Sequence, residues 1–203
     1  MSWVNAKKYS HYDMLEKAIP IVIKETEQWM ANNRDIVAET VNTFGVNSKE
    51  ELTEVPVTPE EYKHMDDWRV LPMFYAKEWN KEVFPESHTI LSTLPGLYQG
   101  LINFIVPGGK IARHRDSGNW DKIEEHYGYR VDGYSVVLNL HNGMKDKKEK
   151  TVGMEVDNII KYPMTGDIVA FDGRAAAHSM WNDVKEWRIT AVLDFDKRYF
   201  NVD

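Results

Sequence analysis

The sequence predicts a mainly β protein with helices at its N-terminal end and a sandwich or jelly roll as its core. Two observations predict this architecture. Apolar residues recur at helical spacing over residues 12–31, whereas from residue 97 onward short apolar runs alternate with turn residues. Strands spaced in this way are typical of antiparallel β folds. For 203 residues we expect one domain, with a helical part over 1–67 and the β core over 68–203.

The N-terminal helices are predicted from periodicity and capping residues. Residues 12–31 place five side chains on one helical stripe: Leu15, Ile19, Val22, Thr26 and Trp29. Pro20 lies inside this pattern, so we expect it to kink or restart the helix. A second helix is expected over 34–44, ending at Gly45, and a short one after a loop, opening at Thr58.

The β core is predicted from short runs rich in β-branched and aromatic residues. The first covers residues 68–75, and one or two helical turns are expected over 85–92. The remaining strands are expected over 97–106, 110–115, 134–140, 151–156, 159–162, 168–171, 177–181 and 187–195. Between them lie a polar, aromatic insertion at 117–132 and a charged segment at 145–150, which is typical of a solvated hairpin loop.

Composition excludes several classes of function. A net charge of −7 argues against a surface for nucleic acid or an anionic membrane. Neither an apolar run of membrane-spanning length nor a signal-like N-terminus is present, so we expect a cytoplasmic protein. The chain contains no cysteine, so any metal must bind to histidine and carboxylate side chains.

Three residues form the candidate metal site. His114 and Asp116 end the strand expected over 110–115, and side chains two apart on a strand share a face. His178 follows three alanines that leave room around its ring. Two imidazoles and one carboxylate are the facial triad of non-haem Fe(II) oxygenases, which leaves coordination positions open for chemistry.

Other interpretations of these residues remain open. A lone histidine such as His178 is more often structural, and a zinc hydrolase would accept the same three ligands. His126, in the polar insertion, and His141, after a strand, are weaker candidate ligands. Arg188 opens the last strand, where its guanidinium either forms a surface ion pair or grips the carboxylate of a bound dicarboxylate.

With these motifs in place, the chain from about Trp68 to Phe195 resembles the aspartyl/asparaginyl β-hydroxylase family of Fe(II)/2-oxoglutarate dioxygenases. The segments that carry the resemblance are FPESHTILSTLPG (84–96), INFIVPGGKIARHRD (102–116), VVLNL (136–140) and GDIVAFDGRAAAHSMWNDVKEWRITAVLDF (166–195). The resemblance implies a double-stranded β-helix, a cupin-like jelly roll with iron at its mouth. It also implies that His114 and His178 bind the iron and that Arg188 binds 2-oxoglutarate.

The resemblance also assigns further residues and exposes one departure. Asn103 matches the position of a second 2-oxoglutarate group. Family members carry an Arg-x-His pair where this chain has Ser135 and Val137, so the usual substrate is in doubt. We expect Ser135 to line the co-substrate site, and Arg130 is a candidate replacement for the missing arginine. With Trp120, it is also a candidate substrate contact, in an insertion that forms either a lid or a packed surface loop.

These inferences predict an enzyme. We expect a non-haem iron, 2-oxoglutarate-dependent dioxygenase that hydroxylates an unactivated C–H bond of a small polar substrate or a peptide side chain, with succinate and CO2 as co-products. Its expected partners are 2-oxoglutarate, O2 and that substrate, without nucleic acid or membrane. Two rival functions stay open. One is a cupin-like isomerase or hydrolase that does not use 2-oxoglutarate, and the other is a non-catalytic β-sandwich binding module.

Overall fold

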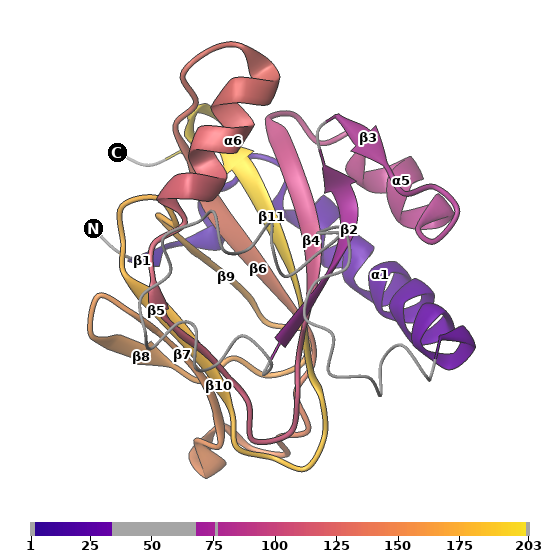
Figure 1. Cartoon of the computed structure of the whole chain (residues 1–203), viewed down its shortest axis with the longest axis vertical. Coiled ribbons are helices and arrows are strands. Elements are labelled where there is room, and N and C mark those ends of the chain that lie inside the picture. Colours follow the sequence, from indigo (N-terminus) through magenta and orange to yellow (C-terminus); the bar gives the residue numbers. More distant parts are fainter. Residues whose placement is uncertain (1–2, 34–67, 76, 202–203) are drawn as a thin grey trace, which may run out of the picture.

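The fold is a mainly β structure of two antiparallel sheets, seen in a computed structural model that describes residues 3–33, 68–75 and 77–201 (Figure 1). The helices expected at 34–44 and from Thr58 lie outside the described residues. The larger sheet has the strand order β1 (Trp3–Val4), β9 (Ile168–Phe171), β6 (Gly133–His141), β11 (Arg188–Asp196), β4 (Leu97–Ile105), β2 (Trp68–Tyr75), β3 (Glu78–Trp79). The smaller has the order β5 (Lys110–His114), β10 (His178–Asn182), β7 (Val152–Val156), β8 (Ile159–Lys161).

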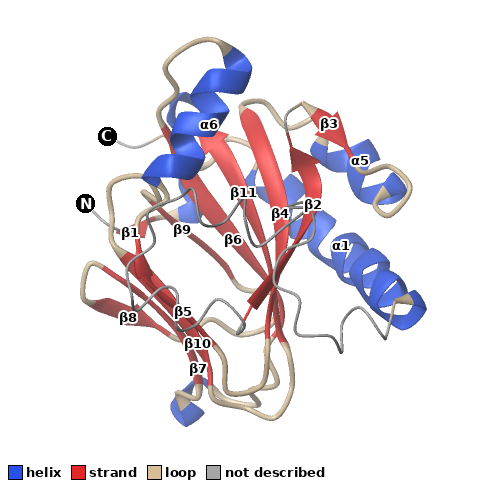
Figure 2. Cartoon of the chain, in the orientation of Figure 1, coloured by secondary structure: helices blue, strands red, loops and turns tan. Residues whose placement is uncertain are grey.

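The helices lie around the larger sheet (Figure 2). They are α1 (Tyr12–Asn32), α5 (Pro85–Leu91) and α6 (Ser117–Tyr127), with short 3-10 turns at Ala6–Lys8, Lys147–Glu149 and Lys197–Tyr199. The expected double-stranded β-helix class is confirmed, and the predicted strands from residue 97 onward are all present with small shifts at their ends. In the described part of the chain, no helix is long and apolar enough to cross a membrane.

Two sequence predictions about helices need correction. Helix α1 continues through Pro20 as one element, so the expected restart is wrong, because its stripe of Leu15, Ile19 and Val22 is buried against the sheet and packing outweighs the missing N–H. The insertion after Asp116, predicted only as a polar segment, forms helix α6 and ends at Gly128 with a left-handed φ of 75°.

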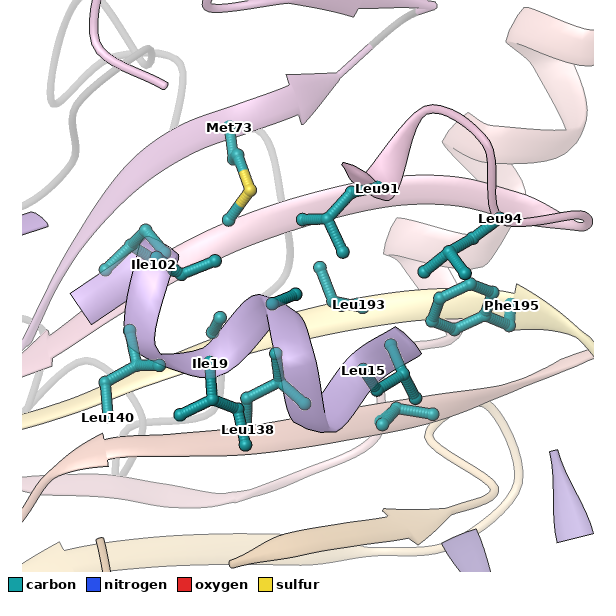
Figure 3. Packing of buried hydrophobic residues seen from close by; sticks show 14 of the residues in the cluster. Leu15, Ile19, Met73, Leu91, Leu94, Ile102, Leu138, Leu140, Leu193 and Phe195 are labelled. Carbon is teal, nitrogen blue, oxygen red and sulfur yellow. The ribbon is translucent and has the colours of Figure 1, made fainter. Parts of the chain in front are cut away.

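The outer face of the larger sheet packs against α1 (Figure 3). Leu15 and Ile19 of the helix lie over Leu138 of β6 and Leu193 of β11 in this cluster. A second apolar cluster, containing Ile105, Val137, Phe171 and Met180, fills the space between the two sheets. Burial of these side chains is the main term that stabilises the sheet pair.

Strand β11 contributes side chains to the inner face of the larger sheet, the face that lies toward the smaller sheet and carries the candidate site. Because side chains alternate along a strand, its odd-numbered apolar residues face α1 while Arg188, Thr190, Val192 and Asp194 face the smaller sheet. Of these four, Arg188, Thr190 and Asp194 are buried polar side chains. A row of buried polar groups inside a β core is unusual, since each needs a hydrogen-bond partner.

Glu25 joins α1 to α5, and its replacement gives a stability prediction. Its buried carboxylate accepts hydrogen bonds from the backbone N–H groups of Glu86 and Ser87 at the start of α5, at 2.7 and 3.0 Å. Glu25→Ala leaves these N–H groups without partners, so we expect the free energy of unfolding to fall by about 2–4 kcal/mol. Urea denaturation measures this, with Glu16→Ala on the exposed face of α1 as the control. Equal stability of the two variants would contradict the role of Glu25.

Candidate metal centre

The smaller sheet brings the two predicted histidines together. His114 ends β5 and His178 begins β10, and the two residues are direct partners in the antiparallel register. Their ring centroids lie 4.3 Å apart. Asp116 follows β5 by two residues, at the N-cap position of α6, and its backbone N–H donates to the carbonyl oxygen of Gly173. The ligand atoms of all three side chains lie within 4.8 Å of one another.

Hydrogen bonds fix which nitrogen of each histidine faces the centre. Nδ1 of His114 lies 2.7 Å from the carbonyl oxygen of Ala112, and Nδ1 of His178 lies 3.1 Å from that of Ala176. A carbonyl only accepts, so each Nδ1 carries the hydrogen and donates it. In the neutral imidazoles each Nε2 is left as a lone-pair acceptor, the form in which histidine binds metals.

The Asp116 carboxylate completes an arrangement that lacks a positive charge. Its Oδ1 lies 3.2 Å from Nε2 of His114, and its Oδ2 lies 3.3 Å from Nε2 of His178. With both imidazoles neutral, three acceptors converge on one point, and only a cation or shared protons relieve their repulsion. Burial by itself raises the pKa of Asp116, but when the imidazoles carry the shared protons, their positive charges and hydrogen bonds hold this pKa below its ordinary value. These residues could therefore bind a divalent metal.

Arg188 lies at the opposite end of β11 from this centre and is wholly buried. Its Nη1 donates to the carbonyl oxygens of Gly153 at 2.6 Å and Trp181 at 3.2 Å. Among the described residues, its Nε and Nη2 have no hydrogen-bond partner. Burial lowers the pKa of Arg188 to about 9. A buried guanidinium with two unused donors is suited to a carboxylate ligand.

The two other predicted co-substrate residues occupy different parts of the inner face. Asn103 of β4 lies directly opposite Thr190, and Arg188 lies opposite Ile105, so Asn103 is a diagonal neighbour of the arginine. Ser135 of β6 instead lies beside the candidate metal triad of His114, Asp116 and His178. Both Ser135 and Asp116 pack against Gly173. The position that a Cβ of this glycine would occupy is 2.3 Å from the Ser135 Oγ and 3.0 Å from the Asp116 Oδ2.

The structure adds two residues to the site that sequence reasoning missed, Asp194 and Gln99. Ser135 Oγ donates to Asp194 Oδ1 at 2.6 Å, and Gln99 Nε2 donates to Asp194 Oδ2 at 2.6 Å. Burial raises the pKa of Asp194 to about 7, and the charge of Asp116 contributes in the same direction. For Asp194, the sequence did contain one signal. It is six residues from Arg188 in the same expected strand, and this even spacing puts Asp194 and Arg188 on one face of the strand.

The remaining candidates are not brought to the triad. Trp120 is wholly buried in a cluster with Tyr98, Ile123 and Val131, so its expected substrate contact is replaced by a role in anchoring α6. Arg130 is exposed near Glu124 on the protein surface. The alternative ligands are also elsewhere, as His126 is exposed beside the Tyr75 ring and His141 pairs with Glu186 at 2.9 Å.

The insertion at 117–132 contacts the rest of the fold through ion pairs with Arg174. This side chain forms ion pairs with Asp121 and Glu124 of α6, and Tyr127 donates a hydrogen bond to the carbonyl oxygen of Tyr98 at 3.2 Å. The helix therefore packs across the end of the larger sheet where β4 begins. This packing supports the packed-loop alternative for residues 117–132.

Comparison with known proteins assigns the family. The sequence model of the aspartyl/asparaginyl β-hydroxylase family matches residues 30–198. The chain belongs to this family. The match includes Arg188 and the three candidate metal ligands, and it supports a hydroxylase. No curated protein matches the sequence.

Three solved structures that match this chain are distant, with TM-scores below 0.5. A protein from Photorhabdus luminescens has 11% identity and a TM-score of 0.34, covering 50% of this chain and 64% of its own length. A cupin 2 conserved barrel domain protein from Salinispora arenicola has 13% identity and a TM-score of 0.38, with coverages of 65% and 78%. A prolyl-4-hydroxylase from Pseudomonas putida has 20% identity and a TM-score of 0.34, with coverages of 50% and 52%.

Proposed function

We propose that this protein is an Fe(II)- and 2-oxoglutarate-dependent dioxygenase that hydroxylates an unactivated C–H bond of a small polar substrate or peptide side chain. The observation that carries the proposal is the convergence of two imidazole Nε2 atoms and one carboxylate on a common point. A set of two histidines and one carboxylate with open positions is the preferred site of Fe(II) in non-haem oxygenases.

The position of Arg188 supports a dicarboxylate co-substrate. Arg188 bonds to the carbonyl of Trp181, three residues beyond His178 in β10. At about 3.3 Å per residue, this separates the guanidinium from the histidine by about 10 Å. The carboxyl carbons of 2-oxoglutarate are four carbon–carbon bonds apart, about 5 Å. A metal bond of about 2 Å and a hydrogen bond of about 3 Å close the remaining gap.

The residues of this chain have separate tasks in the proposed reaction. Bound Fe(II), with 2-oxoglutarate and O2, supplies the oxidation of the C–H bond and yields succinate and CO2. His114, Asp116 and His178 would hold the metal, and the carbonyls of Ala112 and Ala176 keep the two imidazoles oriented. Arg188 would orient the co-substrate through its free donors, while the apolar cluster around Phe171 and Val137 excludes water.

Succinate formation tests this proposal. Purified protein supplied with Fe(II), 2-oxoglutarate, O2 and a library of amino acids and peptides should form succinate, and at least one library member should raise the rate. Formation should stop when Fe(II) is replaced by Zn(II) or when O2 is removed. Substrate turnover without succinate would favour the isomerase or hydrolase. Absence of both turnover and stoichiometric metal binding would favour a non-catalytic binding module.

A further inference from the structure

Asp194 is a buried carboxylate beside the metal triad for which the proposed reaction has no task. It is 1% exposed, and its side chain faces the smaller sheet from β11. Its hydrogen-bond partner Ser135 lies against the same point at Gly173 as the Asp116 carboxylate. Asp194 is therefore separated from a metal ligand by little more than a serine hydroxyl and a glycine.

Acceptor atoms outnumber donors around Asp194. Ser135 and Gln99 each give it one hydrogen bond, whereas an ionised carboxylate accepts about four. The side-chain oxygen of Gln99 is itself buried and without a partner among the described residues. Among the described residues, the Gln99 oxygen beside Asp194 therefore still needs a hydrogen-bond donor, and the Asp194 oxygens can accept further hydrogen bonds.

The charges of the proposed complex lead to the same requirement. A divalent metal and Arg188 are balanced by Asp116 and a bound dicarboxylate, so the ionised form of Asp194 would have no positive partner among these groups. A buried carboxylate without a positive partner is costly, and a cation placed against it removes most of that cost. A protonated amine supplies both a positive charge and three N–H donors in a compact group.

We propose that Asp194, together with the side-chain oxygen of Gln99, binds the protonated amine of a small substrate, such as a free amino acid, beside the metal triad. This inference rests on the proposed oxygenase function, because the triad defines where the substrate lies. Gly173 allows Ser135 and Asp116 to pack this closely, because a Cβ there would clash with the Ser135 Oγ at 2.3 Å.

The test compares free and acetylated amines without relying on turnover. The protein is loaded with Zn(II) and 2-oxoglutarate, and ligand-observed NMR measures its binding of a mixture of the standard L-amino acids and of the same mixture after N-acetylation. We expect at least one free amino acid to bind and its acetylated form not to bind. Asp194→Asn should weaken that binding about 10- to 100-fold, as for a lost charge-assisted hydrogen bond.

Two further variants separate recognition from folding. Gln99→Met keeps Asp194 and a similar volume, so binding should weaken by about 2- to 10-fold. Asp196→Asn changes a nearby buried carboxylate that pairs with Tyr98 and Arg198, so amine binding should be unchanged. Equal binding of acetylated amines, wild-type binding by Asp194→Asn, or binding of neither mixture would overturn the proposal. Amine binding without succinate formation would instead overturn the oxygenase function alone.

Discussion

Replacing His178 by alanine is expected to weaken metal binding by more than about 100-fold. Losing only an outer partner of a metal ligand costs about 10- to 100-fold, so losing the ligand itself should cost more. The effect should be large here because His178 is 3% exposed and is one of the three side chains in the described part of the chain whose ligand atoms lie within 4.8 Å of one another. Competition titration with a coloured chelator measures the affinity for Fe(II) and Zn(II), and succinate formation should be lost in the same variant.

The control for this variant is His141→Ala. His141 is a histidine of the same fold that pairs with Glu186 at the surface, away from the triad. Its replacement should leave metal affinity and succinate formation unchanged. If His178→Ala bound metal as tightly as the control, His178 would not be a metal ligand. The three side chains would then meet for reasons of packing alone, and any metal would bind elsewhere.

Replacing Arg188 by methionine is expected to remove the response to 2-oxoglutarate without weakening the ligand-free fold. The guanidinium is wholly buried, its Nε and Nη2 have no hydrogen-bond partner in the described part of the chain, and burial lowers its pKa to about 9. A base whose pKa is lowered by folding destabilises the protein below that pKa, and this penalty is relieved as pH rises above it. Methionine fills similar space without the charge, so the melting temperature of the ligand-free variant at pH 7 should equal or exceed that of the wild type.

The same experiment gives the opposite result when ligand is present. 2-Oxoglutarate with Zn(II) should raise the melting temperature of the wild type but not of Arg188→Met, because binding to the native state is what stabilises it. Arg198→Met, at an exposed arginine paired with Asp196, should keep the full response. A response to 2-oxoglutarate in Arg188→Met equal to that of the wild type would show that the carboxylate binds elsewhere.

The β core could be predicted because its strands carry local signals. Short apolar runs and turn residues define β4 to β11, and the His-x-Asp spacing is readable within three residues. Helix α6 was missed because its overall composition is polar. Its helical signal is limited to Trp120, Ile123 and Tyr127 on one face. The restart expected at Pro20 is wrong for the opposite reason, since packing against the sheet outweighs the local helix breaker.

The part of the site around Asp194 could not be predicted because it depends on register. Asp194 meets Ser135 and Gln99, which are 59 and 95 residues away in the sequence. Shifting either pairing by one residue would turn these side chains to the outer face. Trp120 and Arg130 are near Asp116 in the sequence, but Trp120 of α6 is buried in an apolar cluster and Arg130, beyond the end of α6, is exposed.

The most direct measurement is a crystal structure of the protein grown without O2 in the presence of Fe(II) and 2-oxoglutarate, with anomalous data collected at the iron edge. We expect one iron peak at about 2.0–2.2 Å from Nε2 of His114, Nε2 of His178 and a carboxylate oxygen of Asp116. The far carboxylate of 2-oxoglutarate should lie on Nε and Nη2 of Arg188. Iron bound away from these three side chains, or a dicarboxylate that does not reach the arginine, would contradict the account.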